Sequence, residues 1–288
     1  MSPRIKDIPG WAGGIACPPQ AGTAFMLRGR LGAAAPQMGR ALDARVARRP
    51  PIAAPPGAGY NSPVKALDLH PWDVSTAGAV EIQRRLAPRV VREGAPASVR
   101  RVAGVDISVG RGSAAGCGAV IVVRYPEMEV EEQAIVEARV SFPYVPGLLS
   151  FREIPVLLAA FRRVKERPDL LLVDGQGLAH PRRFGLACHL GLLLDVPAVG
   201  CAKSRLCGEH APLAAEAGAR VPLTDGDEVI GVVLRTRDGV APVYVSVGHR
   251  IGLDEAAAWA LRCCRGYRIP EPLRLAHMAA GGALARNS

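Results

Sequence analysis

Apolar residues recur at helical spacing once the chain passes residue 73. Asp73 or Ser75 can cap a helix that runs to about Arg92, and Pro88 should kink or shorten its last turns. The pattern then changes to runs rich in β-branched residues that are separated by short turns. These runs predict three strands in an antiparallel meander, over residues 102–109, 119–125 and about 128–141.

The second half of the chain alternates between helical and strand patterns. A continuous apolar run at 169–174 ends in an acid, which is typical of a strand that is buried on both faces. The other predicted elements are helices at about 150–165 and 184–194, strands near 197–201, 228–236 and 242–247, and a helix that Asp254 caps.

This order of elements predicts an α/β fold with one mixed sheet. Three antiparallel strands that continue into strand–helix units place parallel strands beside the meander, with helices on both faces of the sheet. The ribonuclease H-like fold has this order, and we expect that fold for residues 66–288.

Residues 1–65 differ from the rest in composition. Pro, Gly and Ala account for 32 of these 65 residues. Neither the helical nor the strand periodicity of apolar residues survives for more than a few positions. They carry nine Lys or Arg and two Asp or Glu, so most of the chain's net charge of +10 belongs to this segment. We expect a disordered basic extension. The alternative is that the true start codon lies downstream.

Composition also excludes several classes of protein. No stretch approaches the roughly 18 consecutive apolar residues of a membrane span, and no secretory signal is present, so we expect a cytoplasmic protein without a membrane partner. The seven cysteines include no CxxC pair, which argues against a zinc ribbon and a disulfide framework.

Two acids stand out because they lie in apolar strands. Asp106 interrupts the first strand, and Asp174 ends the buried fourth strand, while Glu153 lies near the start of the helix between them. A buried carboxylate is costly unless a cation or a donor compensates it. Converging carboxylates suit Mg²⁺ or Mn²⁺, which would activate water and neutralise a phosphodiester. Each acid alone also fits a helix cap or a salt bridge.

Other candidate residues follow the strands or sit in stiff loops. The two prolines of Pro143-Tyr144-Val145-Pro146 would hold an aromatic side chain at a loop tip, where it can act as a wedge between bases or pack inward. His180 can act as a general acid or base, a phosphate contact or a pocket wall, or be structural. Candidate basic contacts to phosphate are Arg182, Arg183, Lys203 and Arg205, and His249 is expected near the carboxylates.

Taken together, these segments resemble the endonuclease V family, the inosine-directed repair nucleases. The two longest matching motifs are FPYVPGLLSFRE at 142–153 and VDGQGLAHPRRFG at 173–185. Shorter matches are LHPWD at 69–73, AGVDIS at 103–108, GCAKSRL at 200–206 and RIPEPLRLAH at 268–277. Val247 stands before Gly248-His249 where the family has proline.

The resemblance implies a set of site residues. Asp106, Glu153 and Asp174 would bind Mg²⁺, with Mn²⁺ able to substitute, and Lys203 and His249 would assist catalysis. Residues 143–146 would form the strand-separating wedge. The pocket for the flipped hypoxanthine would be formed by Leu148, Gly175, Gln176, Gly177, His180 and Gly200. Ser204 would join Arg182, Arg183 and Arg205 in contacting phosphates.

It also implies an activity. The family cuts the second phosphodiester on the 3′ side of deoxyinosine and leaves 3′-hydroxyl and 5′-phosphate ends. We therefore expect a monomeric DNA repair endonuclease whose partner is deoxyinosine-containing DNA. The open alternatives are a related nuclease for inosine RNA or branched DNA, and a catalytically silent nucleic-acid-binding module.

Overall fold

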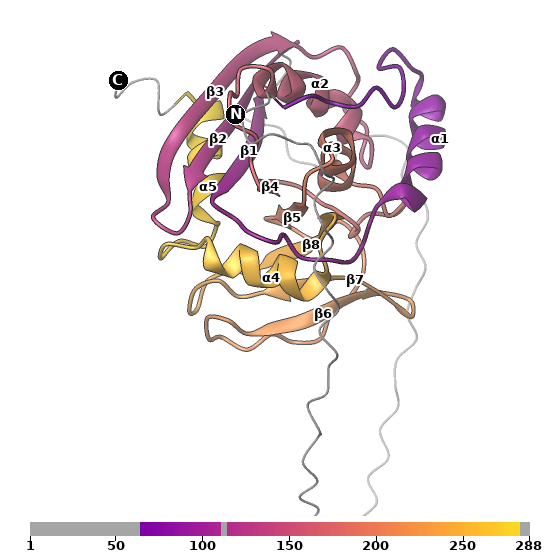
Figure 1. Ribbon diagram of the computed structural model, residues 1–288. Coiled ribbons are helices and arrows are strands. Elements are labelled where there is room, and N and C mark those ends of the chain that lie inside the picture. Colours follow the sequence, from indigo (N-terminus) through magenta and orange to yellow (C-terminus); the bar gives the residue numbers. More distant parts are fainter. Residues whose placement is uncertain (1–63, 111–113, 283–288) are drawn as a thin grey trace, which may run out of the picture. The chain divides into compact units, whose positions relative to one another are not determined.

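The computed structural model describes residues 64–110 and 114–282, which form a mixed sheet with helices on both faces (Figure 1). The strands are β1 (Arg101–Val109), β2 (Ala115–Arg124), β3 (Glu129–Arg139), β4 (Leu170–Val173), β5 (Ala198–Ala202), β6 (Arg220–Asp225), β7 (Glu228–Leu234) and β8 (Val243–His249). The helices are α1 (Thr76–Leu86), α2 (Leu149–Phe161), α3 (Leu186–Leu194), α4 (Leu253–Arg262) and α5 (Glu271–Ala280), with a short 3₁₀ turn at Ala87–Arg89.

The sheet has the order β3-β2-β1-β4-β5-β8-β7-β6. β1, β2 and β3 form the predicted antiparallel meander, and β4 then pairs in parallel with both β1 and β5. The remaining pairs, β5–β8, β8–β7 and β7–β6, are antiparallel. Because the strands at the centre are parallel, β1 and β4 end side by side at the same edge of the layer.

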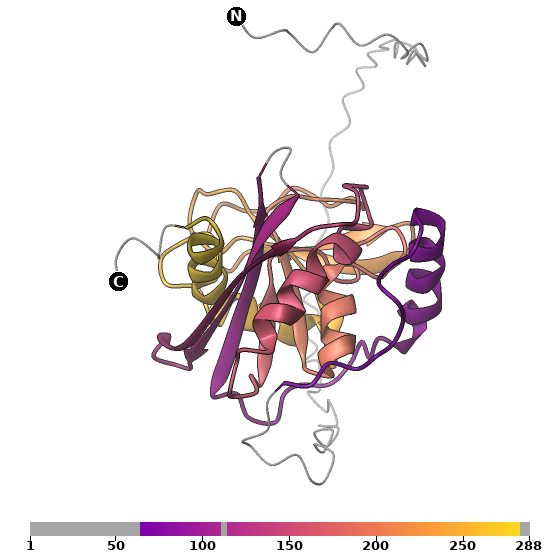
Figure 2. The same cartoon turned by 90° about the horizontal axis from the view of Figure 1, so that it is seen from above.

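Alternate residues of the central strands belong to two separate hydrophobic cores, one on each face of the sheet. Val105, Leu171 and Val173 pack toward α2 and α3, whereas Val102 and Leu172 pack toward α4 and α5. The two helix pairs accordingly lie on opposite faces of the sheet (Figure 2). β4 is buried along its whole length, as its continuous apolar run predicted.

Several predicted boundaries need correction. Helix α1 ends at Leu86, and the 3₁₀ turn that follows it, Ala87–Arg89, contains Pro88. Ser75 rather than Asp73 caps the helix by accepting from the Gly78 amide. Helix α2 ends at Phe161, before the predicted residue 165. Asp254 lies in the first turn of α4, whose N-cap is Gly252, so it is not the cap.

Two elements were not predicted from the sequence, namely β6 and α5. β6 contains Pro222, which is tolerated because the strand lies at the sheet edge. α5 begins directly after Pro270 and has a second proline, Pro272, in its first turn, where no helical hydrogen bond is sacrificed. The consequence is important for the site, because α5 crosses β1.

A glycine on β1 permits this crossing. A Cβ added to Gly104 would lie 2.1 Å from the carbonyl oxygen of Pro272, so only glycine lets the start of α5 lie directly on the strand. This close approach brings the last turns of α5 to the end of β1.

The structure also bears on the predicted domain start and on membrane insertion. Val64 is buried in the core beneath α2 and α3, and the amide of Leu67 donates to the carbonyl of Leu193, so the packed part includes residues before 66. Within residues 64–110 and 114–282, no helix is long and apolar enough to cross a membrane. The predicted extension over 1–65 lies almost wholly outside the described residues.

Candidate active site

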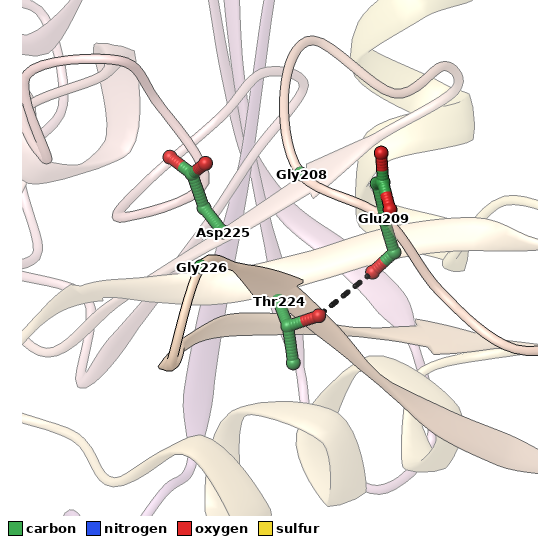
Figure 3. Close-up of a pocket in the computed structure, with 5 residues that line it drawn as sticks. All are labelled: Gly208, Glu209, Thr224, Asp225 and Gly226. Carbon is green, nitrogen blue, oxygen red and sulfur yellow. Dashed lines mark hydrogen bonds between the residues drawn. The ribbon is translucent and has the colours of Figure 1, made fainter.

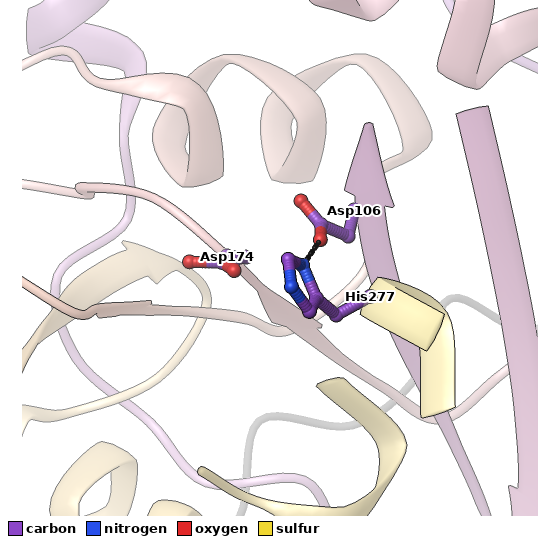
Figure 4. Close-up of side chains that lie close together, drawn as sticks. All are labelled: Asp106, Asp174 and His277. Carbon is purple, nitrogen blue, oxygen red and sulfur yellow. Dashed lines mark hydrogen bonds and ion pairs between the residues drawn. The ribbon is translucent and has the colours of Figure 1, made fainter. Parts of the chain in front are cut away.

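Asp106 and Asp174 meet where β1 and β4 run side by side. Val105 pairs with Val173 in the parallel register, and the Asp174 amide donates to the Val105 carbonyl over 3.1 Å. The two carboxylates, which are only 11% and 12% exposed, therefore lie next to each other (Figure 4). Burial raises the pKa of Asp106, and the negative charge of Asp174 raises it further. The pair thus carries negative charge that the protein only partly compensates.

Glu153 adds a third acid from α2. Burial raises the pKa of its carboxyl to about 8, and the charges of Asp106 and Asp174 add to this shift. A carboxyl with such a pKa holds a proton at neutral pH unless a cation takes the proton's place. Glu153 therefore faces the same concentration of negative charge.

His277 completes the cluster from α5. Its Nδ1 lies 2.6 Å from a carboxylate oxygen of Asp106 (Figure 4). One ligand atom from each of Asp106, Asp174 and His277 lies within 4.8 Å of the others. Sequence reasoning missed this histidine as a site residue because α5 was not predicted, although the motif RIPEPLRLAH ends in it. A helical stripe of Leu273, Ala276 and Ala280 was the signal that could have placed it.

Lys203, a candidate phosphate contact, lies beside the same carboxylates. It follows β5, the strand parallel to β4, and its Nζ lies 2.5 Å from an Asp174 carboxylate oxygen. The same nitrogen lies 3.4 Å from Nδ1 of His277. Lys203 is therefore the cation nearest to the carboxylates among the residues that the structure describes.

His249 does not join this group, which corrects its expected position. β8 runs antiparallel to β5, so that His249 pairs with Ala198 at the start of β5, whereas Lys203 follows the end of that strand. The buried imidazole accepts from the Val91 amide through Nδ1 and faces Asp195 through Nε2 at 3.5 Å. It thus lies at the opposite end of β5 from the carboxylates.

The predicted wedge is an exposed loop tip. Tyr144 is 69% exposed, and Pro143 and Pro146 beside it are exposed as well, whereas Val145 is half-buried. Both ends of this tip are anchored: the Phe142 carbonyl accepts from Arg152, and the Gly147 carbonyl accepts from three side chains. The loop therefore presents an aromatic ring to solvent from a fixed base.

The predicted pocket residues share tight backbone packing. A Cβ on Gly177 would lie 2.1 Å from the Val247 carbonyl oxygen, and one on Gly200 would lie 2.5 Å from the Gly177 amide nitrogen. The side chain of Leu186 packs against Gly175. Leu148 is buried near the wedge loop. Close packing therefore explains why glycine stands at these positions, in addition to their candidate role in binding a base.

Gln176 has an unusual environment between two of these loops. Its Nε2 donates to the carbonyl of Ser204 over 2.9 Å, while its buried Oε1 has no partner among the described residues. The side chain thus joins the loop after β4 to the loop after β5 and keeps one acceptor free.

Most of the predicted phosphate contacts are engaged within the protein. Arg183 pairs with Asp225 and Glu228, at 2.9 and 2.7 Å, and Arg205 donates to the Gly208 carbonyl. Arg182 donates to Gly147 and Gln83 rather than facing solvent freely. Only Lys203 among the predicted basic residues lies at the carboxylates.

His180 is also committed to internal contacts. Its Nδ1 accepts from the Arg182 amide, so Nε2 carries the hydrogen that is donated to the Gly147 carbonyl. Burial lowers its pKa to about 4, which keeps the ring neutral at pH 7. Of the alternatives considered for His180, this geometry fits a structural residue or a pocket wall.

A separate hollow lies at the far edge of the sheet. Gly208, Glu209, Thr224, Asp225 and Gly226 line it, and the Thr224 hydroxyl donates to the Glu209 carbonyl (Figure 3). None of the residues of the carboxylate cluster lines this hollow.

The carboxylate cluster fits a divalent cation. Asp106 and Asp174 offer carboxylate oxygens and His277 an imidazole nitrogen within 4.8 Å of one another. Burial, and then the neighbouring carboxylates, raises the pKa of both Asp106 and Glu153. Mg²⁺ and Mn²⁺ prefer such hard ligands. The arrangement is suited to hydrolysis of a phosphodiester, whose own charge also needs neutralisation.

Comparison with known proteins agrees with this chemistry. The family model for Endonuclease V matches residues 84–278. A curated Endonuclease V from Dehalococcoides mccartyi is 52% identical over 217 residues, which cover 75% of this chain and 97% of the relative. A curated Endonuclease V from Gloeobacter violaceus is 52% identical over 220 residues, covering 75% of this chain and 89% of the relative.

Solved structures of the same family share the fold. The crystal structure of Endonuclease V from Streptomyces avermitilis has a TM-score of 0.70 and 41% identity, and the match covers 75% of this chain and 96% of that one. Endonuclease V from Ciona intestinalis, in complex with DNA containing an inosine followed by a ribo-adenosine, has a TM-score of 0.63 and 26% identity, with 74% and 98% covered. These matches confirm the predicted ribonuclease H-like fold class.

Proposed function

This chain belongs to the endonuclease V family, and we propose that it is a divalent-metal-dependent DNA repair endonuclease that recognises deoxyinosine. It hydrolyses the second phosphodiester bond on the 3′ side of the lesion and leaves 3′-hydroxyl and 5′-phosphate ends. The observation that carries this proposal is the convergence of Asp106, Glu153, Asp174 and His277 beside Lys203.

Asp106, Glu153 and Asp174 would hold Mg²⁺, or Mn²⁺ in its place, with His277 beside them. The cation would neutralise phosphate charge and lower the pKa of a bound water. The Lys203 ammonium adds a positive charge next to Asp174, where it stabilises negative charge that develops on the phosphate. The phosphorus–oxygen bond to the 3′ oxygen breaks as water adds to phosphorus, which yields the two ends named above.

Recognition is assigned to the neighbouring loops. Tyr144 fills the space that an extruded hypoxanthine leaves in the duplex, because its exposed ring stands on an anchored loop. The extruded base is surrounded by Leu148, Gly175, Gln176, Gly177, His180 and Gly200. Hypoxanthine differs from adenine in carrying O6 and N1–H, so polar groups along that edge can discriminate between the two bases.

Inosine-containing RNA is retained as a second candidate substrate. The Ciona relative was solved with a ribonucleotide directly after the inosine, which makes the sugar at this position a variable worth testing. A catalytically silent module is disfavoured, because a cluster of acids with raised pKa values costs stability that a mere binding surface does not need.

The decisive experiment is a cleavage assay with the full chain. The substrates are duplex DNA with a single inosine, the same duplex with adenine, inosine RNA and a four-way junction, each with Mg²⁺, Mn²⁺ or EDTA. We expect one nick in the inosine strand, at the second bond 3′ to the lesion, that a DNA ligase can reseal. Cutting of RNA or the junction alone would transfer the proposal to that substrate, and binding without any cleavage would establish the silent module.

A further inference from the structure

The carbonyl oxygen of Gly147 is the meeting point of three side-chain donors. Gln83 donates through Nε2 over 3.0 Å, His180 through Nε2 over 2.9 Å and Arg182 through Nη2 over 2.7 Å. Gly147 directly follows the wedge loop, residues 143–146. We call this arrangement the Gly147 clamp, meaning Gly147 with Gln83, His180 and Arg182.

The backbone conformation at the centre of this clamp favours glycine. Its φ is +79°, in the left-handed region, and an added Cβ would lie 2.8 Å from Nη2 of Arg182. The backbone turn and the crowded donors thus act together to fix where the exposed loop ends and α2 begins.

The side-chain amide of Gln83 uses both its nitrogen and its oxygen in hydrogen bonds. It is 1% exposed on α1, and its Nε2 also donates to the Phe184 carbonyl over 3.2 Å. Its Oε1 accepts from Nε of Arg182 over 2.5 Å. These three hydrogen bonds fix the orientation of the amide. Gln83 therefore joins α1, the wedge loop and the loop after β4.

The clamp connects two parts of the proposed mechanism. The loop after β4 begins at Asp174, a proposed metal ligand, and contains His180 and Arg182. The wedge loop, residues 143–146, ends at the clamped carbonyl. Among the residues that the structure describes, Gln83 makes no hydrogen bond to Asp106, Glu153 or Asp174, so its effect on catalysis must pass through these loops.

We propose that Gln83 is a positioning residue that holds the Tyr144 wedge in register with the base pocket. This inference rests on the proposed function, because it assumes that Tyr144 enters an inosine-containing duplex. A preorganised loop does not lose conformational freedom on binding, and loosening it therefore weakens engagement of the duplex more than it slows chemistry.

Two substitutions separate the contacts of Gln83. Gln83→Met keeps the length of the side chain and removes all three hydrogen bonds. Gln83→Glu keeps the shape and the contact to Arg182 but removes both donations and places a negative charge against two carbonyl oxygens. The matched control is Ser75→Ala, which removes the N-cap of the same helix and leaves the Gly147 clamp untouched.

The readout is the KM and kcat for nicking of inosine duplex and of single-stranded inosine DNA. We expect both Gln83 variants to raise KM on the duplex by about tenfold, the scale of one buried hydrogen bond left unmade, with kcat nearly unchanged. Single-stranded DNA needs no strand separation and should be affected much less. Ser75→Ala should lower the melting temperature without changing the ratio between the two substrates.

A double-mutant cycle tests whether Gln83 acts through the wedge. If it does, adding Gln83→Met to Tyr144→Ala should cause no further loss on the duplex, because the side chain that the clamp positions is already gone. Additive losses, equal losses on both substrates, a fall in kcat alone, or failure of both Gln83 variants to fold would each overturn the inference. Failure of the unmodified chain to prefer inosine would instead overturn the proposed function.

Discussion

His277 Nδ1 lies 2.6 Å from a carboxylate oxygen of Asp106, a residue 171 positions earlier in the chain. The contact exists because α5 lies directly on β1, where Gly104 leaves room for the start of the helix. The same imidazole nitrogen also lies 3.4 Å from Nζ of Lys203. His277 therefore touches both the acidic and the basic members of the candidate site.

This relationship predicts different consequences for two histidines. His277→Gln should lower inosine-specific cleavage by about a hundredfold or more, the scale of removing an acid, base or charge-orienting group from a reaction centre. The measurement is single-turnover cleavage in Mg²⁺. The matched variant is His249→Gln at the other end of β5, which should lower stability and leave the single-turnover rate near that of the unmodified protein. A large loss of cleavage in His249→Gln, with little loss in His277→Gln, would instead support the sequence-based expectation that His249 acts at the carboxylates.

The two aspartates provide the strictest test of the metal site. Asp106→Asn and Asp174→Asn keep the side-chain shape and remove a charged oxygen ligand, so cleavage should fall by at least ~10³. Binding of inosine DNA should persist, which a gel-shift assay in Ca²⁺ can measure. Asp254→Asn is the control, because Asp254 is 90% exposed and lies outside the cluster. Cleavage by Asp106→Asn at the unmodified rate would remove Asp106 from the site.

The sequence predicted what depends on local pattern and on strand order. The apolar run before Asp174 and the acid inside β1 indicated that the two carboxylates could lie side by side, and the parallel pairing of β1 with β4 brings them together. It did not place His277, because the helix that carries it begins among prolines and was not predicted. It misplaced His249, because only the antiparallel β5–β8 register decides which end of the sheet a residue reaches.

The basic side chains show a related limit of sequence reasoning. Arg182 and Arg183 are candidate phosphate contacts in the sequence because their side chains are basic. The partners that occupy them, Gln83, Asp225 and Glu228, are distant in sequence and become visible only in the folded chain. Lys203 lies beside Asp174 because β5, which it follows, pairs with β4.

Tyr144 should contribute to lesion engagement rather than to bond cleavage. Tyr144→Ala should weaken binding of inosine duplex by ~1–3 kcal/mol, the usual contribution of one stacking contact. Tyr144→Phe keeps the ring and serves as the control. Binding to single-stranded inosine DNA should suffer less, because it needs no unstacking. Equal losses on duplex and single strand, measured by fluorescence anisotropy, would exclude a wedge.

Removal of residues 1–63 should leave the inosine preference intact. All proposed ligands, wedge residues and pocket residues lie beyond position 100, and Val64 is the first residue of the buried core that the structure describes. The removed segment carries eight Lys or Arg and two Asp or Glu. For every DNA phosphate that these basic residues neutralise, their removal should make the slope of log affinity against log salt shallower by about 0.9.

The measurement is binding of inosine and control DNA over a range of salt, with the full chain and with a chain that begins at Val64. We expect a parallel loss of affinity for both DNAs at low salt and little change in melting temperature. Unfolding of the shorter chain, or loss of inosine preference at constant salt, would show that the segment belongs to the nuclease domain.

Glu153 should make the metal-free protein less stable at high pH. Its pKa is about 8 in the folded chain and near 4.5 when unperturbed, so the folded state binds the proton more tightly than the unfolded state. The stability that this proton contributes is complete below about pH 4.5 and is lost as the pH rises through 8. The raised pKa of Asp106 acts in the same direction.

Denaturant unfolding in EDTA at pH 5, 7 and 9 checks this sign. Glu153→Gln cannot ionise, so the free energy of unfolding of this variant should exceed that of the unmodified protein by an amount that grows from pH 5 to pH 9. Glu81→Gln, whose carboxylate is 73% exposed, should show no such trend. Mg²⁺ should restore stability at pH 9 more than at pH 5, because it replaces a proton that is already absent at pH 9. A Glu153→Gln difference that is flat with pH, or one that shrinks as the pH rises, would mean that Glu153 is ionised and compensated within the metal-free fold.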